Sequence, residues 1–169
     1  MKERLNINDK VTVRMNRAQE NAAFLIPVIG ILEARLFDKD GNLKDSREQM
    51  FNLIVTNGKN AIADQLLASP TITKPTHMGV GTGTTAAAAG DTALGTEVGT
   101  RQAFTTKTRS NNEVSMVATF AAGNATGAIT EAGIFTAVSA GTMYSRIVFS
   151  AINKGASDSL ELTWKYTIG

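Results

Sequence analysis

The sequence predicts an all-β fold: a jelly-roll-like antiparallel β-sandwich with one short helix and an N-terminal arm. Three observations favour it. Small residues and threonine dominate the second half of the chain, apolar and polar residues alternate along several of its segments, and turn residues separate these segments at intervals of roughly 10 to 15 residues. Alternation with a period of two indicates strands with one buried and one solvated face, arranged in an antiparallel sheet.

The chain has 169 residues, a length that suits one domain. Residues 1–22 are polar and charged with weak periodicity, so we expect an N-terminal arm that is ordered only against a neighbour. Within it, Val11–Val13 could add a short strand. Residues 23–169 are expected to form a single β-sandwich domain.

Two strands are predicted at Gly30–Phe37 and Gln49–Val55. The turn residues between them include Asp38, Asp40 and Asn42 with a glycine at position 41, and Asp-Gly and Gly-Asn supply the positive φ angles of a hairpin turn. The alternating oxygen ligands also resemble a calcium loop. However, its glycine comes fourth rather than sixth, and a glutamine replaces the glutamate of the twelfth position. We therefore predict a plain hairpin.

A helix is predicted at Thr56–Ala68, with Thr56 or Asn57 as its cap and Ser69-Pro70 as its end. It should close one end of the β core. Its apolar face is expected to carry the residues that recur at helical spacing, which are Ala61, Ile62, Gln65 and Leu66.

The rest of the chain reads as a short strand at His77–Val80, a long glycine- and alanine-rich loop, and a series of strands. The loop, residues 82–98, has few large apolar side chains, so we expect neighbouring subunits to order it. The later strands are predicted at Arg101–Arg109, Glu113–Phe120, Ile129–Phe135, Met143–Phe149 and Leu160–Ile168. The first of these is polar on both faces and is expected at a sheet edge.

The composition removes several kinds of chemistry. The chain has no cysteine and one histidine, which excludes disulfides, thiolate sites and three-histidine zinc sites. The net charge is +2, and the densest cationic cluster, Arg101, Lys107 and Arg109, is expected on a solvated strand face, so no nucleic-acid partner is predicted. The longest apolar run, Phe24–Leu32, is shorter than the ~20 residues of a membrane span. We expect no membrane partner and no signal peptide.

Four groups of residues are candidates for a site, and each has a favoured structural explanation. The segment Gly81–Ala86 matches a relaxed dinucleotide fingerprint, but no helix can follow it, so a flexible glycine loop is expected. We expect His77 to be a loop or packing residue. Asp91 and Glu131 are possible members of a carboxylate pair, with solvated charges favoured.

The fourth group consists of Trp164 and Tyr166. Both alternate with leucines on the predicted buried face of the last strand, so core packing is favoured over a ligand platform. The sequence thus predicts no catalytic, cofactor-binding or metal-binding residue, and a protein that is not an enzyme.

Several segments, in this order, resemble a recurrent type of tailed-phage virion protein. They are Val55–Asn60, Met78–Thr84, Asp91–Leu94, Ile129–Phe135, Gly141–Met143, Arg146–Phe149 and Leu160–Ile168. The resemblance covers roughly residues 50–169. It implies a small β-sandwich module of the virion surface with no catalytic residues and no cofactor.

The resemblance implies a protein that acts in the virion after assembly in the host cytoplasm. The short chain favours a capsid decoration (cement) protein that binds several capsid subunits and stabilises the shell. Its expected partners are the major capsid protein or other virion proteins. It is also expected to form a homo-oligomer, with a trimer favoured. The alternative is a neck, collar or tail-fibre component that binds a receptor or carbohydrate.

Overall fold

The structure is a computed structural model that describes residues 28–169. The predicted arm, residues 1–22, and the start of the predicted domain, residues 23–27, lie outside the described residues. The described residues form nine strands and one helix. Their bounds are β1 Val28–Phe37, β2 Leu43–Ile54, α2 Thr56–Asp64, β3 His77–Gly81, β4 Glu97–Ala103, β5 Thr106–Ser110, β6 Glu113–Phe120, β7 Gly127–Phe135, β8 Met143–Lys154 and β9 Ser159–Ile168.

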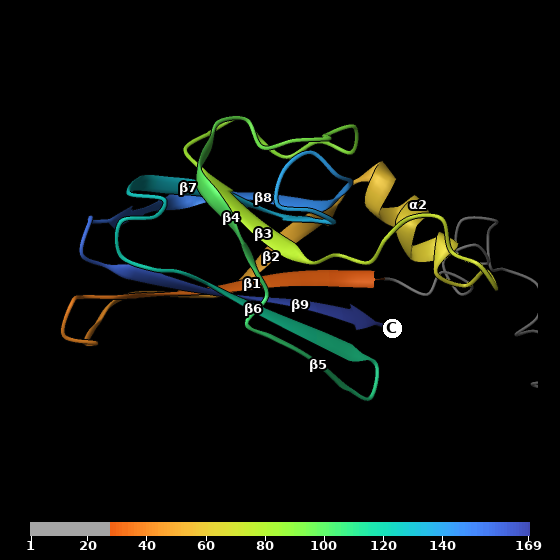
Figure 1. Ribbon diagram of the computed structural model, residues 1–169, viewed down its shortest axis with the longest axis horizontal. Coiled ribbons are helices and arrows are strands. Elements are labelled where there is room, and N and C mark those ends of the chain that lie inside the picture. The colour runs from red at the N-terminus through yellow and green to blue at the C-terminus, as the bar shows by residue number, and fades with distance from the viewer. Residues whose placement is uncertain (1–27) are drawn as a thin grey trace, which may run out of the picture.

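The strands form one antiparallel sheet in the order β4-β3-β7-β8-β2-β1-β9-β6-β5. The sheet curls into a half-barrel (Figure 1), so that β3 and β6, from opposite ends of the order, contribute to one hydrophobic core. The long strand β2 joins the two halves, because it pairs with β1 along its length and with β8 at Leu53 and Ile54. The all-β, antiparallel prediction is confirmed, whereas a two-layered sandwich or jelly roll stays a prediction.

The main core fills the concave face of the curled sheet, and β9 contributes four side chains to it, those of Leu160, Leu162, Trp164 and Tyr166. The fully buried Trp164 lies opposite Leu32 of β1 on one side and opposite Met116 of β6 on the other. Leu160 is flanked in the same way by Leu36 and Phe120. The predicted alternation of β9 is therefore confirmed up to Tyr166, because its buried face packs against the inward-facing residues of both neighbours.

The hairpin turn between β1 and β2 is confirmed. One carboxylate oxygen of Asp38 accepts hydrogen bonds from the backbone N–H groups of Asp40 and Asn42, both at 2.9 Å. Gly41 has a φ of +82°, which a residue without a Cβ adopts without strain. The strand that follows begins earlier than predicted, at Leu43, and a bulge at Gln49 interrupts its pairing with β1. The bulge reverses which residues of the strand face inward. The first half of β2 therefore does not continue the apolar alternation of the second half, and the sequence pattern does not reveal it.

The helix α2 lies at one end of the curled sheet (Figure 1), as predicted, but it ends at Asp64 rather than Ala68. The Asp64 carboxylate accepts hydrogen bonds from the N–H groups of Thr71 and Ile72, each at 2.8 Å, and these contacts hold the chain as it turns back. Leu66, predicted on the apolar helix face, is 88% exposed. The cap prediction is also wrong, because Val55 occupies the N-cap position and no side chain caps the helix.

The predicted edge strand Arg101–Arg109 is wrong, because this segment forms two strands at opposite ends of the sheet. Phe104 and Thr105 carry the chain across, and their N–H groups bind the carbonyl oxygens of Thr76 and Val117 respectively. β4 and β5 are therefore both edge strands. The polar composition was a correct indication of an edge, but residue pattern alone does not show that a chain changes from one edge to the other.

Replacing Trp164 with alanine should lower the free energy of unfolding by about 3–5 kcal/mol, because the side chain is fully buried among Leu32 and Met116. Urea denaturation of the purified protein measures this loss. Thr163→Ala on the opposite face of the same strand is the control and should cost less than about 1 kcal/mol. Equal losses in the two variants would contradict the assignment of the faces.

Candidate functional site

The outer face of the sheet carries a loop, residues 82–96, which we call the glycine loop. It arches above β7 and β8 in Figure 1. Leu94 of this loop packs with Val55, Phe135 and Met143 in a second, smaller hydrophobic cluster. The sheet is thus covered on both faces here, with the main core inside and the glycine loop outside.

The Glu131 carboxylate holds both ends of the glycine loop. Its side chain projects from β7, is fully buried, and accepts hydrogen bonds from the N–H groups of Gly83 at 3.0 Å, Gly95 at 2.9 Å and Thr96 at 2.7 Å. Arg146 of β8 adds a charged donor, with its Nε 2.9 Å from Glu131 Oε2. The buried carboxylate therefore has a full set of donors, which offsets the cost of removing it from water.

The Arg146 guanidinium binds the middle of the same loop. It lies 2.8 Å from Asp91 Oδ2 and donates to the carbonyl oxygen of Thr85 at 3.0 Å. The same Asp91 oxygen accepts the N–H of Ala88 at 2.9 Å. We call Asp91, Glu131 and Arg146 the loop lock. Through Glu131 and Arg146, two neighbouring strands bind the glycine loop at its beginning, middle and end, and Asp91 is the loop's own partner for Arg146.

This close approach requires glycine at the end of β3, at Gly81, and at the start of the loop, at Gly83. A Cβ on Gly83 would collide with the Glu131 carboxylate, and one on Gly81 would lie only 2.5 Å from Glu131 Oε1. The Gly-Thr-Gly pattern therefore lets backbone amides surround a carboxylate of the same chain. The predicted absence of a dinucleotide-type helix after these glycines is confirmed, since residues 82–96 form no helix.

Two expectations about this loop are wrong. We expected it to be flexible, and we expected neighbouring subunits to order it because it has few large apolar side chains. Backbone hydrogen bonds to Glu131 and Arg146 supply the order instead, within a single chain. The signal in the sequence is a charged residue, Arg146, within the largely apolar segment Met143–Phe149.

The loop lock is ionised at neutral pH. Burial by itself raises the pKa of Glu131, but the N–H groups of Thr96, Gly95 and Gly83 together with Arg146 outweigh burial and hold that pKa below its ordinary value of 4.5. Burial also raises the pKa of Asp91, but the Ala88 N–H and Arg146 outweigh burial and hold that pKa below its ordinary value of 3.8. Burial opposes the charge of Arg146, but its two carboxylate partners raise the pKa of the guanidinium.

The two carboxylates that the sequence singled out, Asp91 and Glu131, do lie close together. They do not form a bare carboxylate pair, because both bind the guanidinium of Arg146. The prediction that they are solvated is wrong for Glu131, whose side chain is fully buried, and the Asp91 side chain is 23% exposed. Both Glu131 oxygens already accept hydrogen bonds. A carboxylate in this state holds structure together and has no free oxygen to offer a substrate.

The cationic cluster predicted on one strand face is divided between the two edges of the sheet. Arg101 of β4 is only 8% exposed, pairs with Glu97 and lies 3.4 Å from the centroid of the Phe135 ring. Lys107 of β5 donates to the carbonyl oxygen of Pro75 at 3.0 Å, and Arg109 donates to that of Asn111. The solvated face is therefore wrong for Arg101, which fills part of the outer cluster with its guanidinium.

The remaining candidate residues are hydrogen-bonded or packed within the fold. His77 begins β3, and its Nδ1 lies 2.7 Å from Thr76 Oγ1. Trp164 and Tyr166 are buried, and the Tyr166 hydroxyl shares a hydrogen bond with Ser145 Oγ. Core packing of these two aromatic residues is confirmed. Asp38 and Asn42 bind each other within the hairpin turn.

Among residues 28–169, no group of three or more histidine, cysteine, aspartate or glutamate side chains is placed to hold a metal ion. Within the same residues, the only helix is too short to cross a bilayer. Comparisons of the chain with protein-family models, curated proteins and solved structures found no match.

Glu131→Gln should lower the free energy of unfolding by about 3–5 kcal/mol, because it leaves a buried guanidinium and several buried N–H groups without their anionic partner. Hydrogen exchange should accelerate at the amides of Gly83, Gly95 and Thr96. Glu33→Gln, which breaks a partly exposed pair with Lys165, is the matched control and should cost at most about 1 kcal/mol. Unchanged exchange in the glycine loop would show that Glu131 does not hold it.

Acid should weaken the loop lock. Because the pKa of Glu131 is lower in the folded protein than in the unfolded chain, its ionised form stabilises the fold above the ordinary value of 4.5. That contribution is lost as the pH falls through the folded pKa. The difference in melting temperature between the natural protein and Glu131→Gln should therefore be largest near pH 7 and should shrink towards pH 3. An equal difference at both pH values would contradict this linkage.

Proposed function

We propose that the protein is a structural component of a tailed-phage particle, and specifically a capsid decoration protein built on a jelly-roll-like β-sandwich. One observation carries the proposal: segments that resemble virion proteins, although far apart in the sequence, contact one another in the fold. Val55 and Leu94 lie in the outer hydrophobic cluster, and Asp91, Glu131 and Arg146 form the loop lock. The resemblance thus concerns the parts of one folded unit rather than isolated peptides.

A decoration protein needs a rigid body that presents preformed contact surfaces. The loop lock supports such a role, because a loop that is already ordered loses less conformational entropy when a partner binds it. The same face of the sheet exposes apolar side chains close to the loop. Phe51, which is 71% exposed, and Leu53 line a shallow hollow together with Thr84, Ala86 and Ala87 of the glycine loop.

In the proposed role, each copy binds several subunits of the major capsid protein or neighbouring virion proteins. Weak contacts made at the same time add up through multivalency, so no single surface needs high affinity. A symmetric homo-oligomer, with a trimer favoured, would multiply these contacts. The protein would then act in the virion, after assembly in the host cytoplasm, without any catalytic step.

Gold-labelled antibodies raised against the purified chain should decorate intact phage particles in electron micrographs, with the label distributed over the capsid. The matched control is a particle preparation from which the gene has been deleted, and it should carry no label. Deletion should also lower the temperature at which capsids release DNA. Label confined to the neck or tail would replace decoration with a neck, collar or fibre role, and the absence of label from all particles would overturn the virion proposal.

A further inference from the structure

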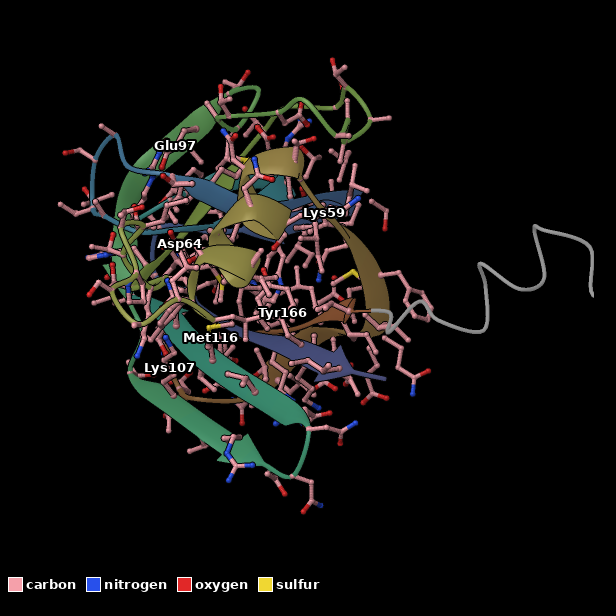
Figure 2. All side chains as sticks on the ribbon, turned by 90° about the vertical axis from the view of Figure 1, so that its right-hand side faces the viewer. Lys59, Asp64, Glu97, Lys107, Met116 and Tyr166 are labelled. Carbon is pink, nitrogen blue, oxygen red and sulfur yellow. The ribbon has the colours of Figure 1, made fainter. Side chains whose placement is uncertain are left out.

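An apolar groove opens at the end of the curled sheet beneath α2. Figure 2 looks onto this end, with Met116, Tyr166 and Lys107 below the helix. The groove has a volume of about 180 Å³. Besides these three residues its lining includes Ile62 of α2, Val114 of β6, Ile168 of β9 and Val28, the first described residue of β1. Such a surface is stabilised when an apolar group covers it.

The part of the chain directly before the groove has the side chains to cover it. Residues 22–27 read Ala-Ala-Phe-Leu-Ile-Pro and lead without a break into Val28, whose side chain already lines the groove. β9 ends beside Val28, which lies opposite Ile168, so the sheet provides no further pairing partner on that side. Ile168 itself remains 48% exposed at the groove, an apolar side chain with room for a neighbour.

The distances are within reach. From Val28, the groove extends across β9 and β6 to Lys107 on β5, which is three strand spacings or about 14 Å across the sheet. Lys107 is in register with Leu32 rather than Val28, four residues or about 13 Å along the strands, so the direct distance is about 19 Å. Phe24 is four residues from Val28 and can reach about 13 Å, and Glu20 is eight residues away and can reach about 26 Å. The segment is therefore long enough to cross the whole groove.

The charges also match. Lys107 stands at the far side of the groove, and its only hydrogen bond within residues 28–169 is to the carbonyl oxygen of Pro75. The positive charge of Lys74 lies near enough to act on it, and burial together with that charge lowers the pKa of Lys107. A carboxylate would suit this position, and Glu20 is the acidic residue closest in sequence to Phe24 on its N-terminal side.

We propose that the groove beneath α2 is the docking site of the chain's own segment Glu20–Pro27, with Phe24 and Ile26 against its apolar lining and Glu20 facing Lys107. In an extended segment, side chains two residues apart lie on the same side. Phe24 and Ile26 then share the side of Val28, and Leu25 points away. This interface does not depend on the virion proposal.

Cross-linking tests the occupant directly, because the natural chain contains no cysteine. The full-length variant Phe24→Cys/Ile168→Cys is treated with a short bismaleimide at about 10 μM, far below the millimolar effective concentration of a short tether. The control pairs Phe24→Cys with Phe51→Cys, an exposed residue of β2 that lies opposite Ile31 and does not line the groove. It is about 11 Å from Val28, so a free tether would reach it as well. We expect the first pair to yield mainly an internally cross-linked monomer and the control to yield several times less.

The other occupants give different results. A cross-linked dimer as the main product would mean that a second copy fills the groove, and it would overturn the proposal, as would cross-linking no greater than in the control. Glu20→Lys should slow the internal cross-link, whereas the same charge change at Glu3 should not. Equal rates for these two variants would overturn the pairing with Lys107.

An apolar dye that fluoresces on binding exposed hydrophobic surface provides an independent measurement. The full-length double variant Phe24→Ser/Ile26→Ser should bind several times more dye than Leu25→Ser, because only the former uncovers the groove. Equal binding by the natural chain and both variants would show that the groove is open to small amphiphilic molecules and would overturn the proposal.

Discussion

The arrangement of the outer face depends on one buried ion pair, Glu131 with Arg146. Two charges inside a protein are costly unless hydrogen bonds satisfy them, and here the backbone of the glycine loop supplies the missing donors and acceptors. The dependence is mutual. The ion pair orders a loop that is too poor in large side chains to order itself, and the loop shields the ion pair from water.

The sheet separates two cores, and both β7 and β8 contribute side chains to each of them. Ala132 and Ile134 of β7 belong to the main core, whereas Phe135 belongs to the outer cluster with Leu94. A register shift between Ile129 and Glu131 accompanies the change, and it helps to direct a carboxylate outward from an otherwise buried strand. The outer cluster and the ion pair therefore stabilise the same loop by different means, one through apolar burial and the other through charge-assisted hydrogen bonds.

These features favour a protein whose task is to present surfaces. The two carboxylates that were candidates for chemistry, Asp91 and Glu131, both bind Arg146. The aromatic residues Trp164 and Tyr166 are buried in the core. Among residues 28–169, the accessible surfaces include the outer hollow beside Phe51 and the edge strands β4 and β5. In a virion structural protein, such surfaces would be the places where other chains are bound.

Sequence alone determined the fold class, most strand positions and the inward face of β9, because apolar alternation and hairpin turns are local properties that a linear pattern preserves. The folded structure alone decided that Arg101 and Lys107 lie on opposite edges, and that Glu131 and Arg146 meet beneath the glycines of a distant loop. These outcomes rest on contacts between residues far apart in the chain, whose partners no local pattern reveals. A charged residue in a largely apolar strand indicates that it has a buried partner, and only the tertiary structure shows which residue that partner is.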